Sequence, residues 1–232
     1  FNLSTRSSGS SGKFVTLSLS LDAIYTDTIQ GVRQFLLQNA NNYYPEDKVL
    51  FIYTLPWWIR NINGKYIQEF LPTTSTVEEV LKKLEETRPK IISTYPTYLT
   101  KMSSYGVDLK KYGVELVVVH SEQSTRQSRE LLEKSLNVKV LDEYSSEELT
   151  RIALECPNNV YHLEEDACYI EIVDPITKQK LGYAQKGVVV GTNLLNTSTP
   201  IIRYFQGDLA TLDKPINCKC GNNCRVLRSI NG

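Results

Sequence analysis

Short apolar runs alternate with longer amphipathic stretches along the first 150 residues of the chain. The runs are rich in Val, Ile and Leu and are bounded by polar residues, which is typical of buried strands. They lie at residues 49–54, 90–94, 114–119 and 138–141. Runs of this kind predict a sheet that is covered on both faces.

Three amphipathic helices are expected around these strands. The first covers residues 22–39, and the others begin at Thr76 and Ser124. At each of these two starts a Glu or Gln three residues later, Glu79 or Gln127, completes the spacing of a capping box. Because strands and helices alternate, we predict an α/β fold with a mainly parallel sheet flanked by helices. Such sheets bind ligands at the carboxyl ends of their strands.

The pattern changes near residue 150, after which period-two alternation and turn signals indicate strands. The expected strands and turns are residues 167–173, 186–192 and 201–204, with turns at Asp174-Pro175 and Gly207-Asp208. We therefore divide the chain into an α/β portion at residues 1–150 and a smaller β-rich, barrel-like subdomain at residues 151–232.

Composition narrows the classes of function. The 232 residues include 26 basic and 26 acidic side chains, so the formal net charge is zero, and a basic footprint for nucleic acid or an anionic membrane is excluded. No apolar run approaches the roughly 20 residues of a membrane-spanning helix, and the first residues do not resemble a signal peptide. We expect a cytoplasmic protein whose five cysteines are free, metal-bound or catalytic.

A serine- and glycine-rich segment near the start is a candidate phosphate loop. Glycines let backbone amides converge on an anion, hydroxyls add donors, and a lysine adds a mobile positive charge. The candidate residues are Ser7, Ser8, Gly9, Ser10, Ser11, Gly12 and Lys13. A Walker A motif requires glycine where Ser7 stands and Ser or Thr where Phe14 stands, so a P-loop kinase or GTPase is excluded. Taken alone, the segment fits a flexible linker equally well.

Four residues of the C-terminal part match the donor set of a structural zinc site. They are Cys156, His162, Cys218 and Cys220. Three thiolates and one imidazole close a tetrahedron without water, so such a metal braces structure rather than reacting. The alternative is that Cys156 is a small buried hydrophobic residue and His162 a surface residue. Cys224 is a spare thiol that would substitute for a neighbouring ligand, and Cys168 is expected in the core.

Several short motifs occur in an order that resembles the adenylate-forming enzymes. Residues 5–13 are similar to their phosphate loop, and residues 117–123 to their adenine-binding strand and segment. Residues 144–147 resemble their Tyr-Gly-Ser/Thr-Thr-Glu motif, and residues 203–209 their Arg-Tyr-Arg-Thr-Gly-Asp-Leu motif. Within this superfamily the phenylacetate-coenzyme A ligase group is the most similar, because its members carry Glu-Cys-Pro, then His, and later Cys-x-Cys-Gly.

The resemblance implies a reaction in which a carboxylate attacks the α-phosphate of ATP and pyrophosphate leaves. A thiol, such as that of coenzyme A, or an amine then captures the acyl-adenylate. The catalytic residues so implied are Glu147, as a ligand of Mg²⁺, and Lys13, which with its loop neutralises the pyrophosphate. The alternative for Glu147 is a carboxylate at a helix start, where it interacts favourably with the helix dipole.

The resemblance also implies how the nucleotide is held. Tyr144 would stack on adenine, and Asp208 would accept hydrogen bonds from the ribose hydroxyls. The remaining implied nucleotide contacts are Ser121, Glu122, Gln123, Ser145 and Ser146. A Gly-Asp pair is also an ordinary turn, which is the alternative for Asp208.

The resemblance extends to the stretch that borders the acyl pocket, but several residues depart from the family pattern. Tyr95 and Tyr98 resemble the stretch that borders this pocket, although packing explains them equally well. His120 replaces a glycine and would narrow the pocket or supply a hydrogen bond. The other departures are Gln123 and Phe14 for proline, Ser145 for glycine and Gln206 for threonine.

The motif order suggests the middle of a longer ligase, because the family's C-terminal lid domain has no counterpart in this sequence. Its expected cofactors are ATP or AMP, Mg²⁺, structural Zn²⁺ and coenzyme A. The expected partners are a nucleotide and an aryl or other small carboxylic acid, without nucleic acid or membrane, and a homodimer is left open. The altered loop and missing lid motivate an alternative, an inactive zinc-braced relative that binds a nucleotide or another ligand.

Overall fold

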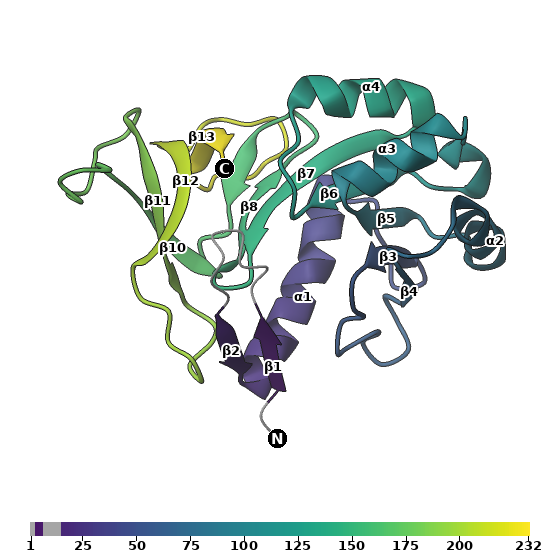
Figure 1. Ribbon diagram of the computed structural model, residues 1–232, viewed down its shortest axis with the longest axis horizontal. Coiled ribbons are helices and arrows are strands. Elements are labelled where there is room, and N and C mark those ends of the chain that lie inside the picture. The colour runs from purple at the N-terminus through teal and green to yellow at the C-terminus, as the bar shows by residue number, and fades with distance from the viewer. Residues whose placement is uncertain (1–2, 7–14) are drawn as a thin grey trace. The chain divides into compact units, whose positions relative to one another are not determined.

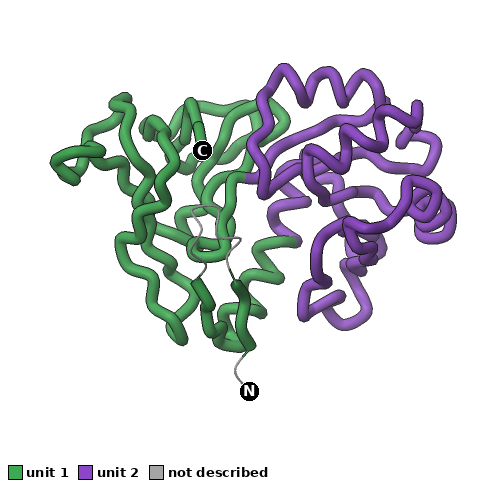
Figure 2. The backbone as a smooth tube through the Cα atoms, in the orientation of Figure 1, with its two compact units in different colours: residues 1–31, 144–232 green, residues 32–143 purple. Residues whose placement is uncertain are grey.

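The computed structural model describes residues 3–6 and 15–232, which form two compact units. Unit 1 comprises residues 1–31 and 144–232, and unit 2 comprises residues 32–143 (Figure 2). This division differs from a single boundary near residue 150, because the N-terminal residues group with the C-terminal strands. One reason is an ion pair within unit 1, in which Arg151 donates to Asp27.

Unit 2 contains the parallel sheet that the sequence predicts. Its strands pair in the order β4-β3-β5-β6-β7, and each neighbouring pair is parallel (Figure 1). Their bounds are β3 Val49–Tyr53, β4 Gln68–Pro72, β5 Ile91–Thr94, β6 Leu116–His120 and β7 Lys139–Ser146, the last residues of which enter unit 1. The four predicted strands are therefore confirmed, whereas β4 was not foreseen.

Helices cover both faces of this sheet, as alternation of strand and helix requires. The helices are α2 Val77–Thr87, α3 Pro96–Ser104 and α4 Arg126–Leu136, with a 3₁₀ turn at Leu109–Tyr112 and α1 at Leu21–Gln38. Side chains of α2, α3 and α4 pack in one core cluster with Leu50 and Val117, whereas Phe35 of α1 packs in another with Val49 and Val118. The two clusters use alternate residues of the same strands, as the period of two predicts.

The starts of two helices test the capping predictions. At α2 the Thr76 side chain accepts from the Glu79 amide and the Glu79 side chain accepts from the Thr76 amide, so the predicted capping box is confirmed. At α4 the prediction was wrong by one residue, because Thr125 is the cap and pairs with Ser128. Ser124 instead accepts hydrogen bonds from Arg129, a nearly fully buried side chain.

Unit 1 contains an antiparallel sheet in the order β10-β11-β12-β13-β9-β8, together with a separate β1-β2 hairpin. The strands are β1 Leu3–Arg6, β2 Thr16–Leu19, β8 Thr150–Glu155, β9 Tyr161–Leu163, β10 Cys168–Val173, β11 Lys186–Asn193, β12 Tyr204–Asp213 and β13 Val226–Asn231. No pairing among the described strands joins β10 to β8, so the barrel-like form is not confirmed.

Two details of unit 1 bear on the predicted turns. Asp174 Oδ1 accepts from the amides of Ile176 and Thr177, as expected of an Asx turn after β10. Gly207-Asp208 lies inside β12 rather than in a turn, and Gly207 has a φ of 95°. Asp208 is therefore held by a strand. Among the described residues, no helix is long and apolar enough to cross a membrane.

Candidate functional site

A half-buried carboxylate in unit 1, that of Glu147, lies directly after the end of β7. Glu147 Oε2 accepts a hydrogen bond of 2.7 Å from the Thr5 hydroxyl on β1. Burial raises the pKa of Glu147, the nearby carboxylates of Glu148 and Asp27 raise it further, and the Thr5 hydrogen bond opposes them. An ionised group in this setting gains from a bound cation, and its oxygens are donors that Mg²⁺ prefers.

Tyr144 and Asp208 belong to two different nucleotide motifs, and the fold of unit 1 brings them together. The Tyr144 hydroxyl donates to Asp208 Oδ2 at 2.5 Å, across 64 residues of sequence. Burial raises the pKa of both groups, and the Tyr144 hydrogen bond partly opposes the rise at Asp208. Among the described residues, the other oxygen of Asp208 has no hydrogen-bond partner, so it is free to accept from a ligand.

Further hydrogen bonds join the segment around residue 146 to the start of β12. Ser146 Oγ donates to Gln206 Oε1 at 3.2 Å and accepts from the Leu149 amide, and the Tyr204 hydroxyl donates to Glu148 at 2.9 Å. Glu148 is only 6% exposed, so its buried hydrogen bond with Tyr204 holds the segment after β7 against the start of β12. Sequence reasoning missed its role, because a second acidic residue beside Glu147 carries no signal of a tyrosine partner 56 positions away.

The cysteine and histidine residues proposed for zinc lie together in unit 1. The ligand atoms of Cys156, His162, Cys218 and Cys220 all lie within 4.8 Å of one another. The sulfurs of Cys156 and Cys218 are 3.8 Å apart, and Cys220 Sγ is 3.3 Å from His162 Nε2. A tetrahedron with zinc–sulfur bonds of about 2.3 Å has sulfurs about 3.8 Å apart, so the donor set and its spacing fit Zn²⁺.

Local turns account for this convergence. Cys156 follows β8 and its amide donates to Val160 at the approach to β9, which carries His162. Gly221, with a φ of 82°, closes the second turn by donating to the Cys218 carbonyl. Burial raises the pKa of the Cys156 thiol, so a cation is needed to favour its thiolate. Cys224 lies outside the cluster of four, and Cys168 lies in the core as expected.

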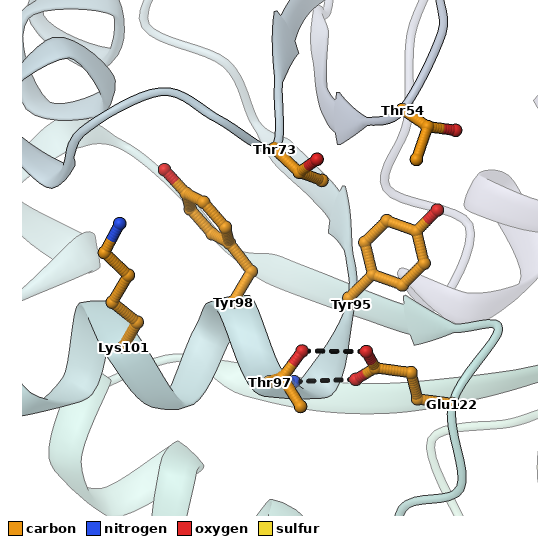
Figure 3. Close-up of a pocket in the computed structure, with 7 residues that line it drawn as sticks. All are labelled: Thr54, Thr73, Tyr95, Thr97, Tyr98, Lys101 and Glu122. Atoms are coloured by element: carbon orange, nitrogen blue, oxygen red, sulfur yellow. Dashed lines mark hydrogen bonds between the residues drawn. The ribbon is translucent and has the colours of Figure 1, made fainter.

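Unit 2 contains a cavity of about 430 Å³ at the carboxyl ends of its strands (Figure 3). Its walls come from the ends of β3 and β4, from the β5-α3 connection and the first turns of α3, and from the segment after β6. The lining residues are Thr54, Thr73, Tyr95, Thr97, Tyr98, Lys101 and Glu122. Glu122 caps α3, since its two oxygens accept from the Thr97 amide and hydroxyl at 2.9 and 2.8 Å.

His120 lies at the end of β6 beside the wall of this cavity. Its ring is in contact with the rings of Tyr53 and Tyr95, with centroid distances of 5.2 and 5.6 Å. Its Nε2 and Nδ1 atoms form hydrogen bonds with Ser93 and Ser121 at 3.1 and 2.9 Å. His120 is 8% exposed and does not itself line the cavity, whereas Tyr95 and Tyr98 do.

The predicted nucleotide contacts fall into three groups. Ser121, Glu122 and Gln123 belong to unit 2, while Tyr144, Ser145, Ser146, Glu147 and Asp208 belong to unit 1. The predicted loop residues from Ser7 to Lys13 lie outside the described residues. Sequence reasoning also missed Lys101, although its position three residues after Tyr98 on α3 is a signal that both side chains share one helix face.

Comparison with known proteins gives matches of sequence and of structure. The chain is 32% identical over 108 residues to a phenylacetate-coenzyme A ligase of Thermus thermophilus, covering 45% of this chain and 24% of that protein. It is 33% identical over 101 residues to a phenylacetate-coenzyme A ligase of Pseudomonas putida, covering 42% and 23%. No family model matches the sequence.

Solved structures match over nearly the whole chain. A 2-hydroxyisobutyryl-CoA ligase in complex with 2-HIB-AMP and CoA superposes with a TM-score of 0.82 at 18% identity, over 99% of this chain and 52% of that one. ATP-bound MatB from Rhodopseudomonas palustris gives a TM-score of 0.70 at 13% identity, over 98% and 47%. The chain thus spans about half the length of these structures, and its matched segment about a quarter of the curated relatives.

These matches confirm the predicted resemblance to the adenylate-forming enzymes. The sequence relatives are phenylacetate-coenzyme A ligases, and the chain has the α/β fold of the acyl-CoA ligase structures.

Proposed function

We propose that this chain is the nucleotide-binding portion of an AMP-forming acid–thiol ligase. The observation that carries the proposal is the meeting, within unit 1, of motifs that lie far apart in the sequence. Thr5 of β1 contacts Glu147 at 2.7 Å, and Tyr144 contacts Asp208 at 2.5 Å. Both carboxylates are half-buried, and burial raises the pKa of each, a cost that functional sites maintain more often than ordinary surfaces.

Glu147 serves as the Mg²⁺ ligand in this proposal. Its raised pKa means that the ionised form is destabilised in this environment. A hard divalent cation beside the carboxylate would stabilise that form. The Thr5 hydroxyl holds one carboxylate oxygen in place and leaves the other for the metal. Mg²⁺ bound there supplies positive charge to the phosphates, and Lys13 with its loop adds to it at the departing pyrophosphate.

Asp208 and Tyr144 hold the nucleoside. A carboxylate has about four lone-pair positions, so Asp208 accepts from the ribose hydroxyls while it retains the Tyr144 bond. That bond also fixes the orientation of the tyrosine ring, whose face then stacks on adenine. Ser145 and Ser146, which follow Tyr144 in unit 1, complete the purine contacts in this unit.

The chemistry proceeds in two displacements. A carboxylate oxygen of the acid attacks the α-phosphorus, and the bond from that phosphorus to the bridging oxygen of pyrophosphate breaks. The thiol of coenzyme A, or another thiol or amine, then attacks the acyl carbon, loses its proton, and releases AMP. Positioning the reactants in line and neutralising the leaving charge are the contributions of the residues named above.

The Cys₃His cluster is a structural zinc site in this proposal. All four donors are used by the metal, so no position remains for a reacting water. Zinc held by these residues would join the turn after β8 to the segment at residues 218–221 and would support the sheet that contains Asp208. An inactive relative has no observation in its favour, since Glu147 and Asp208 are both present within unit 1.

Exchange of labelled pyrophosphate into ATP tests this function in the complete gene product. The exchange should depend on an added carboxylic acid and should fall by about 100-fold or more in Asp208→Asn and Glu147→Gln, since each loses transition-state or positioning interactions. Exposed Glu85 of α2 offers a matched control, Glu85→Gln, which should leave the rate unchanged. If a broad set of carboxylic acids gives no exchange, the chain is the inactive relative.

A further inference from the structure

The cavity of unit 2 contains polar groups that the protein itself does not use. Lys101 Nζ lies 5.4 Å from the centre of the Tyr98 ring and, among the described residues, makes no ion pair. The hydroxyls of Thr54 and Thr73 also have no hydrogen-bond partner in the described part of the chain. Lys101 and Thr54 are exposed and Thr73 is half-buried, so these donors are open to a ligand with acceptor groups, and the ammonium group favours an anionic one.

The carboxylate in the cavity wall already has hydrogen-bond donors within unit 2. Glu122 accepts from both the Thr97 amide and the Thr97 hydroxyl, at the N-terminus of α3. A carboxylate at a helix N-terminus is stabilised by the helix dipole, so Glu122 has little need of Lys101 as a partner. The lysine therefore remains available to a ligand.

Two tyrosine rings give the cavity rigid aromatic walls. Tyr95 is stacked on Tyr53 at 5.1 Å with an interplanar angle of 7°, and the Tyr98 hydroxyl donates to the Ser75 carbonyl at 2.8 Å. In Figure 3 the two rings lie on either side of Thr73, with Lys101 beyond Tyr98 and Thr54 beyond Tyr95. The cavity thus presents a cation at one end, aromatic surface in the middle and a hydroxyl at the other end.

We propose that this cavity binds an organic acid with two carboxylates and an apolar or aromatic body, and that Lys101 recognises one of the carboxylates. The body lies against Tyr95 and Tyr98, and the second carboxylate lies toward Thr54, at the end of β3. This inference rests on the proposed function only in taking the bound acid as the substrate. Lys101 is then the residue that selects dicarboxylic over monocarboxylic acids.

Two acids that differ by one carboxylate provide the test. 4-Carboxyphenylacetate and phenylacetate are titrated by calorimetry into the whole chain without ATP, so the outcome does not depend on adenylation. The diacid should bind about tenfold more tightly than phenylacetate, as expected for one charge-assisted hydrogen bond. Lys101→Met should remove this preference without weakening phenylacetate binding, whereas Lys101→Arg should retain most of it.

Lys110→Met is the matched control, because Lys110 is an exposed lysine of the same unit that does not line the cavity. It should keep the full preference for the diacid. Equal binding of the two acids to the unmodified chain, binding of neither, or a preference that survives Lys101→Met would overturn the inference. If MgATP fails to bind in a parallel titration while the Lys101-dependent preference holds, the proposed function fails and the cavity assignment stands.

Discussion

Replacing Glu147 by glutamine is expected to stabilise the ligand-free chain while abolishing its response to MgATP. Burial and the neighbouring carboxylates raise the pKa of Glu147, so its ionised form destabilises the folded state at neutral pH. Glutamine keeps an oxygen that accepts the Thr5 hydrogen bond but carries no charge. Removing this unfavourable charge should add about 1 kcal/mol to the free energy of unfolding. A gain of that size raises Tm by about 2–4 °C in a chain of this length.

The pH dependence of this difference follows from the direction of the shift. A carboxyl group whose pKa is raised in the folded state binds its proton more tightly there than in the unfolded chain. The wild-type chain therefore gains stability as the pH falls through the folded-state pKa of Glu147. The advantage of Glu147→Gln should be complete at neutral pH and should disappear below about pH 4, where the unfolded chain is also protonated.

Thermal unfolding followed by circular dichroism measures both effects. Scans at pH 7 and pH 4, with and without MgATP, are compared for wild type, Glu147→Gln and the exposed control Glu85→Gln. A ligand at 100 times its Kd stabilises by about 2.7 kcal/mol, and this gain is expected for wild type and the control only. A ligand-free Glu147→Gln variant that is less stable than wild type at pH 7, or one that MgATP stabilises as much as wild type, would refute these roles of Glu147.

Three further predictions concern the framework around the site. Elemental analysis should find about one zinc per chain, and Cys156→Ser should remove it and lower Tm; an unchanged zinc content would rule out this ligand set. Asp27→Ala leaves the largely buried Arg151 without its carboxylate and should cost about 3 kcal/mol in chemical denaturation, so a cost near zero would contradict the ion pair's role. Thr76→Ala should cost about 1 kcal/mol by the same measurement, because it removes the cap of α2; full stability would show that the cap contributes little.

Periodicity was enough to predict the parallel sheet. The runs that form β3, β5, β6 and β7 are short, apolar and bounded by polar residues. Because alternate residues of a strand point to opposite faces of the sheet, these runs also predict that helices cover both faces. β4 was missed because Gln68–Pro72 mixes polar and apolar residues and contains a proline at its end, which lowers its strand signal. The start of α4 was missed because Ser124 and Thr125 are both good caps, and the choice depends on contacts with Arg129.

The candidate site was predictable where chemistry depends on residue type. Cysteine and histidine are typical zinc ligands, so residue type alone was enough to predict the four residues that meet in unit 1. Contacts that depend on distant pairing were not: neither Tyr144 with Asp208 nor Glu148 with Tyr204 has a local signal. The grouping of residues 1–31 with the C-terminal strands likewise depends on tertiary pairs such as Asp27 with Arg151.

We claim that Glu147 and Asp208, the two hydroxyl-bonded carboxylates of unit 1, form a nucleotide site, and isothermal titration of the chain with MgATP tests this claim most directly. We expect saturable binding to the wild-type chain at one site, weakened at least tenfold by Asp208→Asn and unchanged in Glu85→Gln. Asp208→Asn retains an oxygen for the Tyr144 hydroxyl, so its loss reports on the ribose contact rather than on folding. Binding that is absent from the wild-type chain, or equally tight in Asp208→Asn, would contradict the claim.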